Sequence, residues 1–210
     1  MFFCLYLYSI SANEIIIRKE DFKTNQNFIN IPDYAQLTSY QGKDCLKVQW
    51  TDVNNKWSPH FAKYNLPLEN FKGSTIKFRL YIASQDVSEP SDPWNGIKTT
   101  FVYKVDGKET YPSQTKLRSG TNSWTEVTFQ FDIYSYQTIS DCYLALGLQQ
   151  SSGTVYFSNL TVTASKSLEP SFNTTSSYQC KYTKRVTSRS RARGAMSPGK
   201  YSEEDFSDFK

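Results

Sequence analysis

The chain has 210 residues, of which 16% are aromatic and 21% charged, and its formal net charge is +4. It contains no run of about 20 apolar residues, which excludes a membrane-spanning helix. The positive excess lies in residues 181–210, which hold 8 of the 24 basic and 4 of the 20 acidic residues. The preceding part is therefore neutral, which argues against a nucleic-acid-binding face there.

The chain begins with an uncharged apolar segment, Met1–Ala12, which ends in the small residues Ser11 and Ala12. This segment resembles a secretory signal peptide that lacks the basic n-region, and it predicts a secreted protein with the signal over residues 1–12. The alternative is a buried first strand. Two Asn-x-Thr sequons fit export and predict N-glycosylation at Asn159 and Asn173.

Alternating apolar and polar residues then predict strands over residues 14–19, 44–50, 74–83, 97–105, 108–111, 125–133, 142–149 and 153–163. The Asp106-Gly107 pair between two of them predicts a tight hairpin, because glycine tolerates the positive φ of a type I′ turn. No helical pattern interrupts the series. The sequence therefore predicts an all-β domain over residues 13–163, an antiparallel β-sandwich or jelly roll.

After this domain the composition changes. Residues 164–192 are predicted to be a linker, since 164–178 are rich in Ser and Thr and 181–193 hold six basic residues. The basic run predicts either a nucleic-acid-binding segment or a solvated connector, and the signal-like start favours the connector. Near the end, Ser202 and Asp205 predict a helix start, with Phe206 and Phe209 on one face.

Three cysteines remain once Cys4 leaves with the signal, and an odd number in a secreted protein suggests one disulfide and one spare thiol. Cys45 and Cys142 both lie in predicted strands, so they are the expected pair. The cysteine spacings match no zinc pattern, and the sequence has one histidine, His60.

Residues 124–131, 142–149 and 153–162 resemble the last strands of carbohydrate-binding jelly rolls of the galactose-binding-like type. Such modules often end on a strand that reads glycine-x-aromatic-aspartate-aspartate-valine, and some carry a structural calcium ion. Here Ser158 and Asn159 stand in place of the two aspartates. A neutral pair is a poor ligand set for a hard cation, so no cofactor is expected.

Residues 193–196 and 201–206 are similar to the opening of the catalytic barrel in family 5 glycoside hydrolases, the cellulase type. The resemblance implies that residues 193–210 begin a truncated barrel, whose two catalytic glutamates lie on later strands that this sequence lacks. Hydrolysis with retention needs two carboxyl groups about 5–5.5 Å apart. The chain itself is therefore expected to be inactive.

Sugar rings lie on aromatic side chains while neighbouring amides and carboxylates bind their hydroxyls, so tryptophans in polar loops are the candidates for such binding. Trp94 and Trp57 both stand in such loops, and the alternative is that each caps the core. Trp50 and Trp124 are predicted to be structural, and Tyr81 and Tyr103 to face outward on strands. The predicted carbohydrate-binding residues are Trp57, Trp94, Asp92, Asn95, Asn55 and His60.

The resemblances together predict a non-catalytic polysaccharide-binding or support module of a secreted glycoside hydrolase. The expected partners are a polysaccharide, with β-glucan implied by the tail, and a missing C-terminal barrel; neither nucleic acid nor a membrane is expected. Two alternatives stay open: a stand-alone secreted recognition or adhesion domain, and a jelly roll that supports the barrel without binding sugar.

Overall fold

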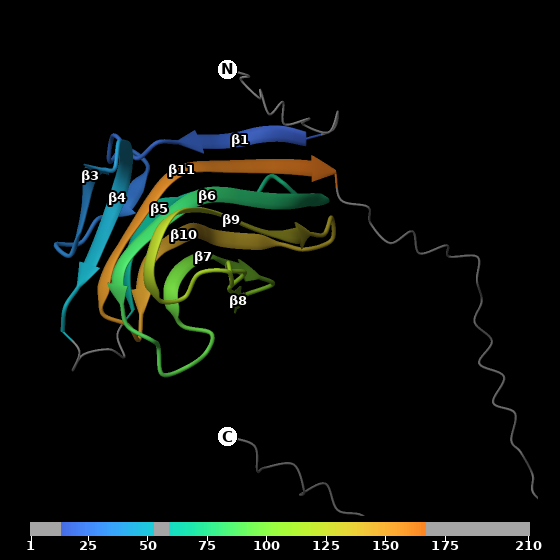
Figure 1. Ribbon diagram of the computed structural model, residues 1–210. Coiled ribbons are helices and arrows are strands. Elements are labelled where there is room, and N and C mark those ends of the chain that lie inside the picture. Colours follow the sequence, from blue (N-terminus) through green and yellow to red (C-terminus); the bar gives the residue numbers. More distant parts are fainter. Residues whose placement is uncertain (1–13, 53–58, 167–210) are drawn as a thin grey trace, which may run out of the picture. The chain divides into compact units, whose positions relative to one another are not determined.

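The computed structural model describes residues 14–52 and 59–166, and every regular element in them is a β-strand. No helix that could span a membrane occurs in these two segments. The strands, shown in Figure 1, are β1 (Glu14–Glu20), β2 (Phe28–Asn30), β3 (Ala35–Tyr40), β4 (Lys43–Trp50), β5 (His60–Asn65), β6 (Ser74–Val87), β7 (Gly96–Val105), β8 (Lys108–Thr110), β9 (Gly120–Ile133), β10 (Ile139–Gln149) and β11 (Gly153–Lys166).

The strands form two antiparallel sheets. One has six strands in the order β3-β4-β11-β6-β9, with β1 paired to β11, and the other has five in the order β2-β5-β10-β7-β8. In the first sheet β4 and β1 share one edge of β11, as Figure 1 shows: β4 pairs with Gly153–Phe157 and β1 with Leu160–Ser165. Asn159 lies at the change of partner with a φ of 51°, which marks a bulge in β11.

The two sheets pack face to face around one hydrophobic core, because each strand alternates buried and outward side chains. Below, the core face of a sheet is the one turned to the other sheet, and the outer face is the one turned away. Phe78 of the six-stranded sheet lies 5.4 Å from Phe101 of the five-stranded sheet, and Phe131 lies 5.3 Å from Phe101, centroid to centroid. Burying each such ring contributes about 1.5–3 kcal/mol, so this contact is a main link between the sheets.

The predicted fold class is confirmed: the molecule is an antiparallel β-sandwich, and each predicted strand lies in or overlaps an observed one. The sequence pattern missed β2, β3 and β5, which are short and carry few β-branched residues. Tyr81 faces outward as expected, with the Lys43 ammonium 5.1 Å from its ring centroid. Tyr103 does not: it is 4% exposed and stacks on Phe131 in the core.

The predicted disulfide is wrong, because both Cys45 and Cys142 are free, buried thiols. Cys142 faces the core from the five-stranded sheet. Cys45 lies on the outer face of the six-stranded sheet, packed against Ala83 and Tyr156. The six-stranded sheet itself therefore lies between the two sulfur atoms.

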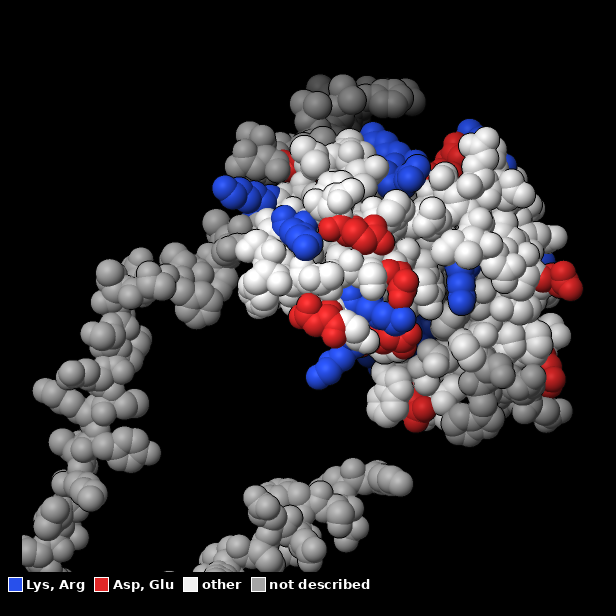
Figure 2. All heavy atoms as spheres, turned by 180° about the vertical axis from the view of Figure 1, so that it is seen from behind, with Lys and Arg blue, Asp and Glu red and all other residues white. Residues whose placement is uncertain are grey.

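Positive and negative side chains are interleaved on the face of the molecule that Figure 2 shows, with uncharged surface between them. This agrees with the charge balance of the sequence outside the tail. The predicted signal peptide (1–12), the barrel start (193–210), most of the linker (164–192) and the residues Asn55, Trp57 and Asn173 lie outside the described residues. Those expectations stay predictions.

Candidate functional site

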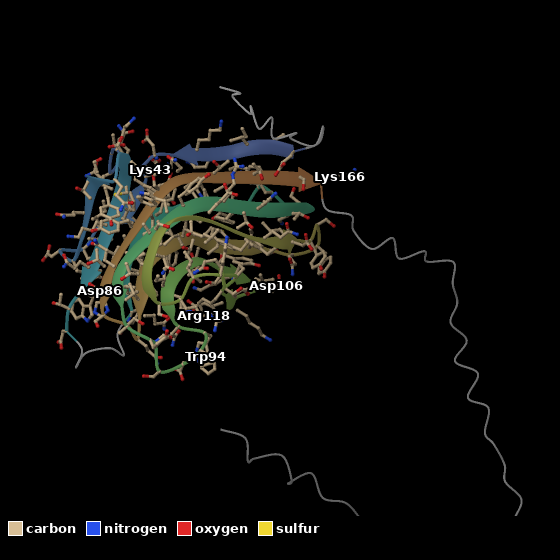
Figure 3. The ribbon with its side chains drawn as sticks, viewed as in Figure 1. Lys43, Asp86, Trp94, Asp106, Arg118 and Lys166 are labelled. Atoms are coloured by element: carbon tan, nitrogen blue, oxygen red, sulfur yellow. The ribbon has the colours of Figure 1, made fainter. Side chains whose placement is uncertain are left out.

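A cleft of about 640 Å³ lies on the outer face of the five-stranded sheet. Strands β5, β7 and β10 form its floor, and the β6–β7 loop (residues 88–95) and the β8–β9 loop (residues 111–119) form its walls. Figure 3 labels Trp94 and Arg118, one from each loop, at the same end of the molecule. The residues that line the cleft include Phe61, Trp94, Lys98, Thr100, Val102, Tyr111, Arg118, Tyr143, Ala145 and Gln149.

Exposed aromatic rings line the walls of this cleft, and its floor holds the small side chains Thr100 and Ala145 together with the rings of Phe61 and Tyr143. Trp94 is 66% exposed and Tyr111 is 56% exposed, and both belong to the walls. The floor includes Ala145, and the outer face of β10 continues with Gly147, where a Cβ atom would lie 1.9 Å from the His60 carbonyl oxygen. Because rings belong to both the walls and the floor, an extended chain with flat apolar faces can pack against this cleft.

The β6–β7 loop is held in place by polar contacts with the end of β10. The Asp92 backbone N–H donates to Gln150 Oε1 at 3.0 Å, and Gln150 Nε2 donates to Asp92 Oδ2 at 2.7 Å. The Asn95 backbone N–H donates to the Asp92 carbonyl at 3.0 Å, and the Asn95 side chain is buried. Asp92 and Asn95, predicted as sugar ligands, are thus placed beside Trp94, and their observed contacts position the loop.

The β8–β9 loop approaches β7 at Gly96, whose φ is 104°. The Ile97 N–H donates to the Arg118 carbonyl at 2.8 Å, and a Cβ atom on Gly96 would lie 2.2 Å from the same oxygen. Only glycine fits this approach. Gln114 fixes the loop further, because its side chain donates to the Ile97 and Leu117 carbonyls at 3.0 and 2.6 Å.

Two cations lie in the cleft, and each contacts the loop that carries Trp94. The Lys98 ammonium donates to the Trp94 carbonyl, and the Arg118 guanidinium donates to the Pro93 carbonyl. Burial lowers the pKa of Lys98 below its usual value, and the positive charge of Arg118 lowers it further. The sequence pattern did not indicate either residue. Lys98 lies within a strand, and Arg118 comes near β7 only because Gly96 lets the two backbones approach.

His60, also predicted as a sugar ligand, is not in this cleft. On β5 the side chain of Phe61 faces the cleft, and His60 is 5% exposed and stacked on Trp50 at a centroid distance of 3.6 Å. Burial lowers the pKa of His60, so the buried ring is held as neutral imidazole, with Asp52 opposing the shift. The sequence pattern did not reveal β5, so the alternation that turns His60 inward could not be seen, and a sugar contact at His60 stays a prediction.

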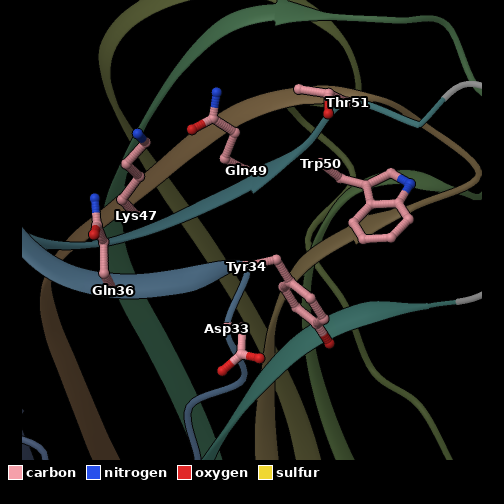
Figure 4. A pocket seen from close by; sticks show the side chains of 7 residues that line it. All are labelled: Asp33, Tyr34, Gln36, Lys47, Gln49, Trp50 and Thr51. Carbon is pink, nitrogen blue, oxygen red and sulfur yellow. The ribbon is translucent and has the colours of Figure 1, made fainter.

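A second hollow, of about 580 Å³, lies beside β3 and β4 and is shown in Figure 4. Its polar side chains Gln36, Lys47 and Gln49 point to one side, away from Trp50 and Tyr34. The Trp50 ring stacks on His60, and its Nε1 donates to the Asp52 carbonyl at 3.0 Å. Since Trp50 already packs one face on the protein, this hollow is the weaker candidate for stacking a sugar ring.

The residues present do not fit the structural calcium site that some jelly rolls carry. The Ser158 hydroxyl is buried and donates to the Asp44 carbonyl at 2.7 Å, and Asn159 is exposed. Within residues 14–52 and 59–166 no group of three or more His, Cys, Asp or Glu side chains could hold a metal ion. A neutral hydroxyl and an exposed amide do not replace two aspartates as calcium ligands.

No protein-family model matches the sequence, and no curated protein matches it. Among solved structures, the CBM22-1 xylan-binding domain of Paenibacillus barcinonensis Xyn10C is similar: the TM-score is 0.52 at 15% identity, over 74% of this chain and 97% of that one. The C-terminal family 22 carbohydrate-binding module of Clostridium thermocellum Xyn10B gives a TM-score of 0.49 at 18% identity, over 72% and 93%. The described part of the chain therefore has the β-sandwich fold of carbohydrate-binding modules.

Proposed function

We propose that this protein is a non-catalytic module that binds a polysaccharide chain in the cleft on the five-stranded sheet. The observation that carries the proposal is the pair of exposed rings, Trp94 and Tyr111, in the walls of one cleft. Sugar rings have apolar C–H faces that pack on such aromatic rings. Polar groups of the cleft, such as the amide of Gln149, are available for the sugar hydroxyls.

Xylan is the first polysaccharide to test, because the similar domain of Paenibacillus barcinonensis Xyn10C is a xylan-binding domain. The competing ligand is β-glucan, which the resemblance of residues 193–210 to a cellulase-type barrel implies. Xylan and β-glucan differ in the substituents of the ring and share the apolar faces, so Trp94 and Tyr111 alone do not choose between them.

We further propose that the module works outside the cell, next to a glycoside hydrolase barrel. The apolar start Met1–Ala12, the sequons and the resemblance of residues 193–210 support this setting. Asn159, the first sequon residue, is exposed and so accessible to modification. A stand-alone adhesion domain is the alternative, and the gene sequence beyond Lys210 separates the two: a barrel with paired glutamates at strand ends supports the enzyme module.

The test is affinity electrophoresis of the full chain in gels containing xylan, β-glucan or mannan. Trp94→Ala and Tyr111→Ala each remove an anchor ring, which typically costs about 2 kcal/mol, or about 30-fold in affinity. Tyr136→Ala is the matched control, since Tyr136 is 76% exposed and lies outside the cleft. Retardation that Trp94→Ala abolishes and Tyr136→Ala preserves supports binding in the cleft. Absence of retardation in all three gels refutes it and favours a support role.

A further inference from the structure

The side chains that line the cleft carry positive charge and no negative charge, and one acid bonded to its wall is Glu109, whose carboxylate accepts from the Tyr111 hydroxyl. Two basic side chains, Lys98 and Arg118, line the cleft, and no aspartate or glutamate is among its lining residues. A neutral polysaccharide requires no such imbalance, because its hydroxyl groups both donate to carboxylate or amide oxygens and accept from N–H groups. The excess of basic side chains therefore indicates a negatively charged ligand.

The two cations lie close to Trp94 because they bind consecutive carbonyls of its loop. Lys98 donates to the carbonyl of Trp94 itself, and Arg118 donates to that of Pro93. Each of these contacts uses one N–H group, so two ammonium protons of Lys98 and four guanidinium N–H groups of Arg118 are left over for another acceptor. The remaining donors therefore lie next to the backbone of the residue that carries the most exposed ring of the cleft.

Neither cation has an acidic partner within residues 14–52 and 59–166. The ion pairs there join Lys23 to Asp21 and Asp44, and Lys104 to Asp141. The two acids of the β6–β7 loop are engaged elsewhere: Asp92 accepts from Gln150 Nε2 at 2.7 Å, and Glu89 accepts from Ser119 Oγ at 2.5 Å.

Two neighbouring like charges without a counter-ion repel each other, and burial adds a desolvation cost to the charged form of Lys98. An anion placed between the two would remove the repulsion and gain charge-assisted hydrogen bonds. A guanidinium and an ammonium side by side suit a planar carboxylate, which can accept from both at once.

We propose that the cleft selects polysaccharides that carry carboxylates, with a uronic acid group held by Lys98 and Arg118 while its sugar ring lies against Trp94. This inference rests on the proposed polysaccharide-binding function and names the ligand class of the same site. Trp94 supplies the apolar contact, and the two cations distinguish a carboxylated polysaccharide from a neutral one. The neighbouring units of the chain extend along the cleft toward Tyr143.

The experiment compares glucuronoxylan with the same polymer after its carboxyl groups have been reduced to primary alcohols, by isothermal titration calorimetry on the full chain. The two ligands share backbone and length and differ only in charge. We expect the reduced polymer to bind about tenfold more weakly, since a hydrogen bond to a charged group is lost. We also expect raising the salt from about 0.05 M to about 0.5 M to weaken glucuronoxylan binding only.

Equal affinity for the two polymers would overturn the carboxylate selection and leave the proposed function standing. Binding of neither polymer would overturn the proposed function as well. Dextran sulfate, a sulfated glycan, is the third ligand: affinity equal to or above that for glucuronoxylan would show attraction to any anion and overturn the assignment to a carboxylate.

Lys98→Gln and Arg118→Gln test the two residues, and Lys77→Gln is the charge-matched control on the exposed outer face of the six-stranded sheet. We expect the first two to lose the preference for glucuronoxylan and keep the affinity for the reduced polymer, while Lys77→Gln keeps both. If Lys98→Gln weakens both polymers alike, the lysine only positions the Trp94 loop, and the proposal is wrong.

Discussion

The outer faces of the two sheets both carry aromatic side chains, but they use them differently. On the six-stranded sheet Tyr40 and Tyr156 stack at a centroid distance of 3.9 Å and an interplanar angle of 4°, and Trp124 packs on Tyr40 at 6.0 Å. On the five-stranded sheet Trp94 and Tyr111 contact no other ring in the described part of the chain. Rings that pack on one another stabilise a sheet, while rings left uncovered in a cleft can bind a ligand.

The largest effect we expect comes from Gly96, which lets the β8–β9 loop approach the cleft. Gly96→Ala places a methyl group 2.2 Å from the Arg118 carbonyl oxygen at a φ of 104°. We expect a loss of about 3 kcal/mol in the free energy of unfolding, measured in urea, together with loss of polysaccharide binding.

Gly42 provides the matched control on the other sheet, in the β3–β4 turn. Its φ is 76°, but a Cβ atom there would meet nothing within 4 Å. Gly42→Ala should therefore cost only the local conformational strain, about 1 kcal/mol, and leave binding unchanged. Equal costs at the two glycines would mean that the close approach to Arg118 does not hold the cleft together.

The next effect separates the two outer faces, because one tryptophan on each face is replaced by alanine. Trp94→Ala should lower affinity for the polysaccharide about 30-fold and leave the melting temperature unchanged, because the ring is mostly exposed. Trp124→Ala should do the opposite: a loss of about 1–3 kcal/mol in stability, since the ring packs on Tyr40 over Cys45 and Ala83. If Trp124→Ala also reduced affinity, the outer face of the six-stranded sheet would be part of the binding surface.

How far the sequence predicts this site depends on where each residue lies. Trp94 was predictable, because a tryptophan in a loop rich in Pro, Ser and Asp has no alternating strand neighbours to pack with. Lys98 and Tyr143 were not predictable. The alternation of side chains assigns them to an outer face, but it does not tell which outer face carries the cleft. Arg118 was not predictable either, because it reaches β7 through a backbone contact that depends on Gly96.

A third, smaller effect concerns the two thiols on opposite sides of the six-stranded sheet. Burial raises the pKa of Cys45 to about 11 and that of Cys142 to about 12. The folded thiols therefore keep their protons where the unfolded ones ionise, so the stability they contribute is present below pH 9 and declines as the pH rises above it.

Urea unfolding between about pH 8 and pH 10 measures this decline. Thiol titration of the Cys4→Ser/Cys180→Ser variant without reductant tests whether both thiols are free and buried. Both thiols should react with iodoacetamide in guanidinium, and neither should react in the native state at pH 8, because reaction needs the exposed thiolate. If no thiol reacted in guanidinium, the two cysteines would be joined by the disulfide that the structure excludes.

The smallest effect concerns His60, the predicted ligand that lies in neither outer face. Its pKa is lowered by burial against Trp50, so the unfolded state binds a proton more readily than the folded state. The stability it contributes is present above pH 6.5 and is lost as the pH falls below that value. His60→Phe keeps a ring on Trp50 and removes the titratable imidazole. Between pH 7 and pH 5 the stability of this variant should therefore fall less than that of the unmodified chain.

The affinity of the His60→Phe variant for the polysaccharide should not change, since His60 points toward the core and Phe61 toward the cleft. A drop in affinity with unchanged pH dependence would mean that His60 contacts the ligand, and would move the binding surface to the end of the sandwich near Trp50.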